Sequence, residues 1–131
     1  MLKFEYAAKF VCGKSDGKLV APGEYWTAIN VHNPVTRAKK FEFRKKFVLA
    51  PPSEKPGKPT DFFDFELPPD FAMEIDRDDI LRHLGVDGFA KGFVVIQSAT
   101  ELDVVAVYTA AGSRTGVSAM CTERVPARKI A

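Results

Sequence analysis

The chain of 131 residues has few of the residue types that carry chemistry. It contains two cysteines and two histidines, and two thiols alone make neither a zinc site nor a disulfide-stapled scaffold. The longest apolar runs, residues 92–96 and 104–108, are far shorter than the roughly 20 residues that cross a bilayer as a helix. Residues 1–6 lack the basic and apolar regions of an export signal. We therefore expect a cytoplasmic protein that does not enter a membrane.

Length and composition predict a single domain over residues 1–131, because domains typically hold about 100 to 150 residues. The net charge of +2 conceals a segregation of charge. Residues 1–60 carry 12 Lys and Arg against 5 Asp and Glu, a net +7, whereas residues 61–103 carry 3 against 11, a net −8. Residues 104–131 are again basic, at +3. We expect a charge dipole, and patches of opposite sign can pair between identical subunits.

Alternation of apolar and polar residues with a period of two dominates the sequence and predicts β-strands. The four residues 98–101 separate the two most apolar strands and have the length of a hairpin turn. We therefore expect those two strands to form a hairpin and to lie centrally. The predicted strands are residues 3–12, 24–33, 39–50, 89–98, 102–111 and 118–125, with short extended runs at 61–67 and 71–75.

The period changes at residues 76–85, which predict one short helix. Asp76 is a typical N-cap, Arg82 and His83 are favourable in the last turn, and Gly85 is a typical stop. Strands at about ten-residue spacing with one helix predict an all-β fold. The specific prediction is an immunoglobulin-like antiparallel β-sandwich of seven or eight strands, with the short helix at one end. A closed barrel is the alternative.

The sequence carries no recognisable catalytic or cofactor motif. Its glycines form no phosphate-binding loop, and no nucleophile has an evident base nearby in sequence. The acidic cluster at residues 74–79 lacks the Gly and Glu positions of a calcium loop, so we interpret it as helix capping. We predict no metal, no cofactor and no enzymatic activity, with an enzyme as a minor alternative function.

The strand predicted at residues 24–33 supplies the first group of candidate ligand or interface residues: Trp26, Asn30, His32 and Asn33. Trp26, Asn30 and His32 share a face, and rings beside amide groups suit sugar recognition. A histidine between two asparagines either binds a ligand or holds a turn, and we favour the turn. A small-ligand or carbohydrate-binding sandwich is accordingly our alternative function.

Lys40, Arg44 and Lys46 form the second group, within a segment holding six basic residues in ten. Basic residues interleaved with rings can bind oligonucleotides. Here the alternation sends Phe41 and Phe43 to the opposite face, into the core, and the acidic middle segment would repel nucleic acid. We favour a solvated outer face that protects a strand edge, and we do not expect a nucleic-acid partner.

Cys12 and Cys121 fall in the first and last of the main predicted strands, which are neighbours in immunoglobulin-like sandwiches. A disulfide between them is geometrically possible. Because no export signal is evident, we favour two reduced thiols.

Several segments resemble a family of uncharacterised bacterial β-sandwich proteins: residues 9–13, 25–34, 67–76, 92–98 and 101–109. A more distant similarity is to sensory rhodopsin transducers, through the late apolar strand ending Ile96-Gln97-Ser98 and the segment 125–128. That resemblance implies a non-enzymatic, oligomeric binding or signalling module. With the missing catalytic residues and the segregated charge, it leads us to predict a homo-oligomeric interaction module with a possible protein partner.

Overall fold

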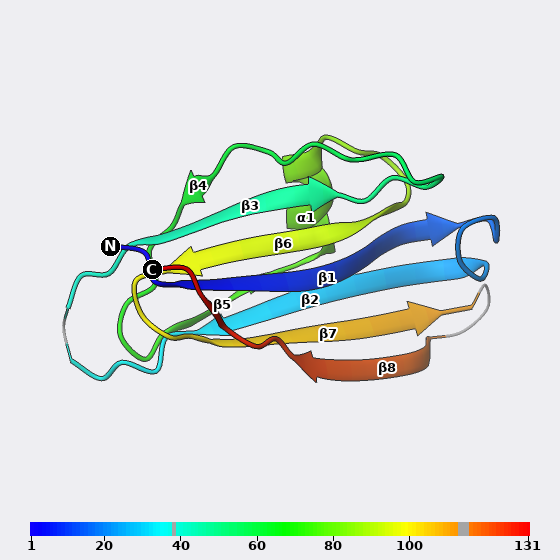
Figure 1. Ribbon diagram of the computed structural model, residues 1–131. Coiled ribbons are helices and arrows are strands. Elements are labelled where there is room, and N and C mark those ends of the chain that lie inside the picture. Colours follow the sequence, from blue (N-terminus) through cyan, green and yellow to red (C-terminus); the bar gives the residue numbers. More distant parts are fainter. Residues whose placement is uncertain (38, 113–115) are drawn as a thin grey trace.

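The computed structural model describes residues 1–37, 39–112 and 116–131, and the chain is mostly β with one short helix (Figure 1). The strands found in the described residues match the predicted strands closely, and one further short strand lies near the end of the chain. The elements are β1 (Phe4–Ser15), β2 (Gly23–His32), β3 (Phe43–Leu49), β4 (Phe63–Asp64), β5 (Ala72–Ile75), α1 (Arg77–Leu84), β6 (Ala90–Ser98), β7 (Asp103–Ala111), β8 (Val117–Arg124) and β9 (Arg128–Lys129).

All of these strands hydrogen-bond into a single antiparallel sheet. Its order is β4-β3-β6-β1-β2-β7-β8, with β5 paired to β2 and β9 paired to β1. The sheet is not closed, so the barrel alternative is wrong. The immunoglobulin-like prediction required two separate sheets, whereas the observed pairing runs continuously through β1.

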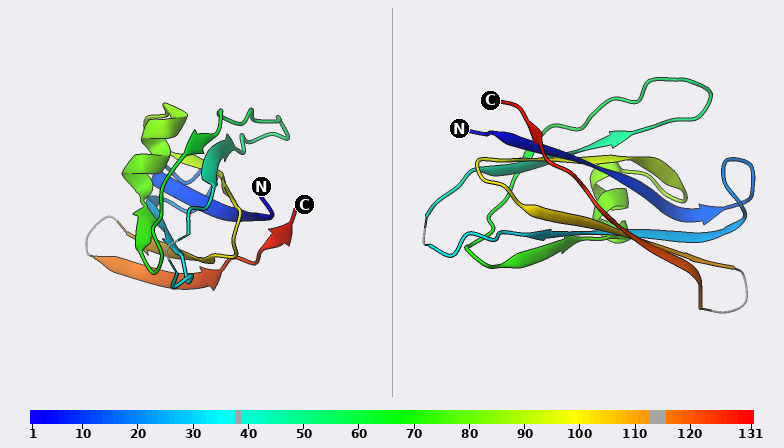
Figure 2. Two further views of the ribbon diagram at one scale, coloured as in Figure 1. Left: turned by 90° about the vertical axis from the view of Figure 1, so that its left-hand side faces the viewer. Right: turned by 60° about the horizontal axis from the view of Figure 1, so that its bottom comes forward.

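Strand β1 joins the two halves of this sheet at a corner. Phe4 to Cys12 pair with β6, and Gly13 to Ser15 pair with β2. Gly13 has φ of 113°, and a Cβ there would lie 1.8 Å from the carbonyl oxygen of Gly88. Only glycine fits such a position without strain. Beyond the corner the halves diverge, as the view along the strands shows (Figure 2, left).

The core lies between these diverging halves and is filled by alternate residues, as the period of two predicted. Two tyrosines tie the halves together across it. The hydroxyl of Tyr6 accepts a hydrogen bond from the backbone N–H of Leu102 at 2.6 Å, and the hydroxyl of Tyr108 donates to the carbonyl of Lys9 at 2.8 Å. The largest fully buried apolar side chains are Tyr6, Phe10, Phe47, Ile29, Ile80, Ile96, Val31, Val94 and Val104.

The predicted helix is confirmed, but its expected place at one end of the strands is wrong, because it lies behind them (Figure 1). Asp76 caps α1 by accepting from the backbone N–H of Asp79, and Gly85 ends it with φ of 66°. Ile80 is fully buried, and the helix contacts β1, β2 and β3. The helix therefore packs alongside these strands and covers one side of the core. In the described part of the chain, no helix is long and apolar enough to span a membrane.

The predicted hairpin at residues 98–101 is wrong, although both of its strands are central. β6 lies between β3 and β1, and β7 lies between β2 and β8. The connection crosses from one half of the sheet to the other. It is held there by hydrogen bonds from Ala99 N–H to the carbonyl of Glu42 and from Leu102 N–H to Tyr6.

The two cysteines are not neighbours. β1 pairs with β6, β2 and β9, and β8 pairs with β7. Cys12 is buried in the core and Cys121 is exposed, and both are free thiols. β8, the last of the predicted strands, does not lie beside β1, because β2 and β7 come between them in the sheet. The short β9, which the sequence pattern did not predict, pairs with the start of β1.

Candidate functional site

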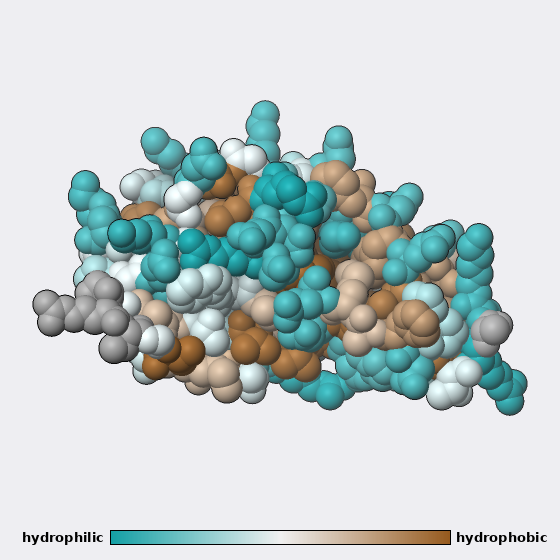
Figure 3. All heavy atoms as spheres, turned by 180° about the vertical axis from the view of Figure 1, so that it is seen from behind, coloured by the Kyte–Doolittle hydropathy of each residue, from teal (hydrophilic) through white to brown (hydrophobic). Residues whose placement is uncertain are grey.

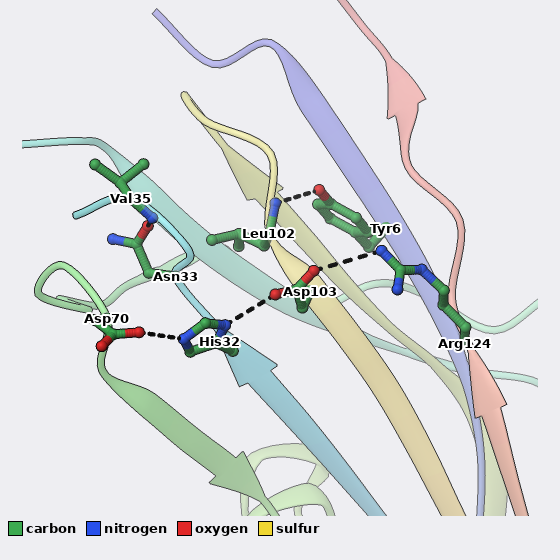
Figure 4. Close-up of polar contacts among 8 residues, drawn as sticks. All are labelled: Tyr6, His32, Asn33, Val35, Asp70, Leu102, Asp103 and Arg124. Carbon is green, nitrogen blue, oxygen red and sulfur yellow. Dashed lines mark hydrogen bonds and ion pairs between the residues drawn. The ribbon is translucent and has the colours of Figure 1, made fainter.

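His32 lies at the end of β2 between two carboxylates. Its Nδ1 is 2.8 Å from Oδ2 of Asp103, the first residue of β7. Its Nε2 is 2.9 Å from Oδ1 of Asp70, in the loop between β4 and β5 (Figure 4). A neutral imidazole has one N–H, so only the protonated ring donates to both partners. The hydrogen bonds to Asp103 and Asp70 therefore raise the pKa of His32 above its ordinary value.

Arg124 extends this arrangement to a third strand. Its Nη2 is 3.4 Å from Oδ1 of Asp103, so the end of β8 joins the same carboxylate that holds the imidazole. We call Asp70, His32, Asp103 and Arg124 the His32 clamp. With both ring nitrogens engaged, His32 has no free nitrogen to ligate a metal or to act as a base. Across residues 1–37, 39–112 and 116–131, no group of three or more His, Cys, Asp or Glu could hold a metal ion.

Asn33 follows directly and is fully buried. Its amide Nδ2 donates to the carbonyl of Leu67 at 2.9 Å, and its Oδ1 accepts from the N–H of Val35 at 3.1 Å (Figure 4). Its backbone carbonyl also accepts from the N–H of Asp70 at 2.8 Å. Asn33 thus positions the loop that carries Asp70, and its contacts are those of a turn-forming residue.

Trp26 and Asn30 point outward from β2, away from the core. The guanidinium carbon of Arg77 lies 5.0 Å from the centroid of the Trp26 ring and covers one of its faces. Asn30 is exposed, opposite Val105 and Glu74 in the neighbouring strands. This strand therefore presents a partly covered ring and an exposed amide as separate features.

Arg44 and Lys46 share the outer face of β3, as predicted, and Phe43 is buried beneath it. Both cations lie over Phe62, with Arg44 Cζ at 4.0 Å and Lys46 Nζ at 4.7 Å from the ring centroid. The Arg44 Nε also donates to Gln97 at 2.7 Å. Phe62 lies in the extended run predicted at residues 61–67, but the sequence pattern did not indicate that its ring would lie against Arg44 and Lys46.

A cavity of about 530 Å³ lies beside the start of β3 and brings Lys40 and Arg44 together, while Lys46 stays with Phe62. Its apolar lining includes Phe41, Phe43 and Phe65. The Phe43 and Phe65 rings stack with centroids 5.4 Å apart, and Phe41 lies 6.4 Å from Phe43. Phe65 belongs to the short extended run that was predicted, but its position against β3 depends on the long connection between the two segments.

Strand β8 has an unusual surface for an eight-residue strand, because every one of its residues is exposed. It pairs with β7 along one edge. Val117 and Met120 are each 67% exposed. Seen from behind, hydrophobic side chains gather along part of the lower border of the molecule (Figure 3). This strand therefore offers an apolar surface together with an edge.

Fold and sites together define a small, mostly β protein with a continuous antiparallel sheet. No protein-family model matches the chain, and no curated protein matches it in sequence. Among solved structures it is similar to the crystal structure of Thermotoga maritima 1070, with a TM-score of 0.61 over 95% of this chain and 92% of that one. The two chains are 14% identical, so the likeness establishes the fold alone.

Proposed function

We propose that this protein is a non-catalytic interaction module that works as a homo-oligomer, with β8 as the contact between copies. The observation that carries the proposal is the exposure of β8 along its entire length. A strand that pairs on one edge only leaves backbone N–H and C=O groups free along the other, and this favours pairing with a further strand.

The sequence of β8 supports self-pairing. Natural edge strands are usually protected by charge, proline or a bulge. Residues 117–122 carry no charge and no proline, and the shift in the β7–β8 register, which leaves Ser118 without a partner in β7, is confined to the start of β8. Only Glu123 and Arg124, at the end of the strand, are charged. In an antiparallel pair, the charged end of one copy lies beside the uncharged start of the other, so like charges stay apart.

We also propose that the fold is sandwich-like and that the chain has a signalling role. Core residues come from both diverging halves of the sheet, which favours a sandwich-like arrangement folded at the Gly13 corner. A sandwich that assembles with itself agrees with the resemblance to sensory rhodopsin transducers, which implies an oligomeric signalling module and a protein partner. The carbohydrate-binding alternative on β2 has less support, because Arg77 covers Trp26 and both nitrogens of His32 are engaged.

Disulfide scanning along β8 tests this contact. In a two-fold antiparallel pair, the residue on the axis faces its own copy with Cα atoms about 4.5 to 5.5 Å apart, within reach of a disulfide. Single cysteines are placed at residues 119, 120, 121 and 122 in a chain lacking both native thiols. Mild oxidation is expected to cross-link one of these positions, with the adjacent ones reacting weakly.

The matched control is Leu19→Cys, which places an exposed thiol in the β1–β2 loop, since Leu19 is 48% exposed. It reports random collision. If no β8 position cross-links faster than Leu19→Cys, the proposed contact is wrong.

A further inference from the structure

The cavity beside β3 has the size and lining of a small-molecule site. Its volume of about 530 Å³ lies within the roughly 300 to 1,000 Å³ typical of such sites. Phe41 and Phe65 are only partly buried, so part of each ring is accessible, and the buried Phe43 holds them in one cluster. An apolar or aromatic group in the cavity would find edge and face contacts with these rings.

Charged side chains of both signs surround this aromatic cluster. Lys39, Lys40 and Arg44 line the cavity together with Asp64 and Glu66. Of the ion pairs seen among the described residues, none involves any of these five side chains. Their charges are therefore available to a ligand.

Arg44 is already ordered without a carboxylate partner. Its Nε donates to Gln97 at 2.7 Å, and its guanidinium lies 4.0 Å from the centre of the Phe62 ring. A side chain fixed in this way loses little conformational entropy when it binds an anion. Glu42 also lines the cavity, but its carboxylate pairs with the N-terminal ammonium group of Met1 at 4.0 Å, so Asp64 and Glu66 are the carboxylates left to a ligand.

A ligand with a single charge would meet like charges as well as opposite ones in this lining, whereas a zwitterion can satisfy both signs. We infer that the cavity binds a small zwitterion with an apolar ring, of the class of aromatic amino acids. This inference is independent of the proposed self-association, because the cavity lies at the β3–β4 end of the sheet and β8 is the opposite end.

The experiment follows backbone amide resonances by NMR while four probes are added up to millimolar concentrations. L-Phenylalanine carries the ring and both charges. 3-Phenylpropionate lacks the ammonium group, 2-phenylethylamine lacks the carboxylate, and glycine lacks the ring. We expect L-phenylalanine to shift resonances of residues 39–44 and 64–67 and to bind about tenfold more tightly than each of the others, since each lost group removes a charge-assisted or apolar contact.

Two charge-neutralising variants separate the two signs. Lys40 and Glu66 are exposed, so Lys40→Gln and Glu66→Gln leave the core intact. Lys40→Gln is expected to weaken the binding of L-phenylalanine severalfold and to leave the binding of 2-phenylethylamine no weaker. Glu66→Gln is expected to weaken the binding of L-phenylalanine severalfold and to leave the binding of 3-phenylpropionate no weaker. Lys18→Gln, an equal charge change in the β1–β2 loop, is the matched control and is expected to change nothing.

Two results overturn the inference. One is the absence of resonance shifts around the cavity with every probe. The other is equal affinity for all three ring-bearing probes, unaffected by Lys40→Gln and Glu66→Gln, which would mean that the cavity recognises the ring alone.

Discussion

The two histidines occupy opposite electrostatic environments. His32 contacts two carboxylates, and these hydrogen bonds raise its pKa. His83, in the last turn of α1, stacks on Phe47 with centroids 4.7 Å apart and planes 12° apart, and also contacts Phe63. Burial lowers the pKa of His83, and the neighbouring Arg82 and Lys45 lower it further. Protonation should therefore stabilise the fold at His32 and destabilise it at His83.

The pH dependence of unfolding is expected to separate these effects. The ordinary histidine pKa is 6.5. Because the folded-state pKa of His32 is raised, its stabilising contribution is complete below about pH 6.5 and is lost as the pH rises through the folded value. The difference in unfolding free energy between wild type and His32→Gln should therefore shrink as the pH rises, as measured by urea unfolding between about pH 6 and pH 9.

His83→Gln is the matched control, with the opposite sign. Since the folded-state pKa of His83 is lowered, its contribution is present above about pH 6.5 and is lost as the pH falls. If the difference in unfolding free energy between wild type and His32→Gln stays constant between about pH 6 and pH 9, the imidazole in the His32 clamp is not charged.

The sequence could indicate His32 and Asn33 as a strand-end pair, but not their partners. Asp70 lies 38 residues from His32, and Asp103 lies 71 residues away. Periodicity assigns a residue to a face of its own strand and carries no information on which distant loop approaches that face. The same limit applies to Phe62 and Phe65, which come from the extended run predicted at residues 61–67 and complete the surroundings of Arg44.

At the level of the elements, alternation and capping predicted most of what is observed. The helix begins and ends where Asp76 and Gly85 indicate, and alternate residues of β1 and β2 are buried, as a period of two predicts. Pairing was harder to predict, because a four-residue connection can close a hairpin or cross between the halves of a sheet. The contact of Tyr6 with Leu102, 96 residues apart, holds the crossing in place.

Thr27 fastens β1 to β2 where the two strands begin to diverge. It is 1% exposed, and its hydroxyl donates to the carbonyl of Val11 at 3.0 Å and accepts from the N–H of Val11 at 2.9 Å. Thr27→Val keeps the shape but leaves both backbone groups unpaired, which should lower the unfolding free energy by about 2 to 4 kcal/mol. Urea unfolding measures this loss.

The matched variant Thr27→Ser keeps the hydroxyl and removes one methyl group, which should cost about 1 kcal/mol. If Thr27→Val unfolds with the same free energy as wild type, the two hydrogen bonds contribute nothing at this junction.

For the whole molecule, the net charge of +2 describes little, because opposite charges occupy different elements. The basic first 60 residues include β1 and β3, with Arg44 and Lys46 on an outer face. The acidic segment includes β5 and α1, with Asp78 and Asp79 in the first turn of the helix. We expect this segregation to orient approaching copies, while the apolar edge strand β8 holds them together.

The sequence predicts a β-rich chain, as observed, but it does not predict that the sheet is continuous. The immunoglobulin-like prediction assumed that consecutive strands divide into two sheets, but the residues at the corner, Gly13 opposite Tyr25, pair across it. Exposure of β8 was also not predictable, because Val117, Ala119, Met120 and Cys121 give it the apolar content of a half-buried strand. Only the arrangement of the other strands leaves both faces of β8 uncovered.

Light scattering on a size-exclusion peak tests self-association through β8 most directly. The wild-type chain is expected to give a multiple of 14.5 kDa, and Met120→Lys, which puts a charge into the uncharged part of β8, is expected to give 14.5 kDa or a mass that falls on dilution. Leu19→Lys, with the same charge change in an exposed loop, should keep the wild-type mass. A wild-type mass of 14.5 kDa at high protein concentration, or an unchanged oligomer in Met120→Lys, would contradict the account.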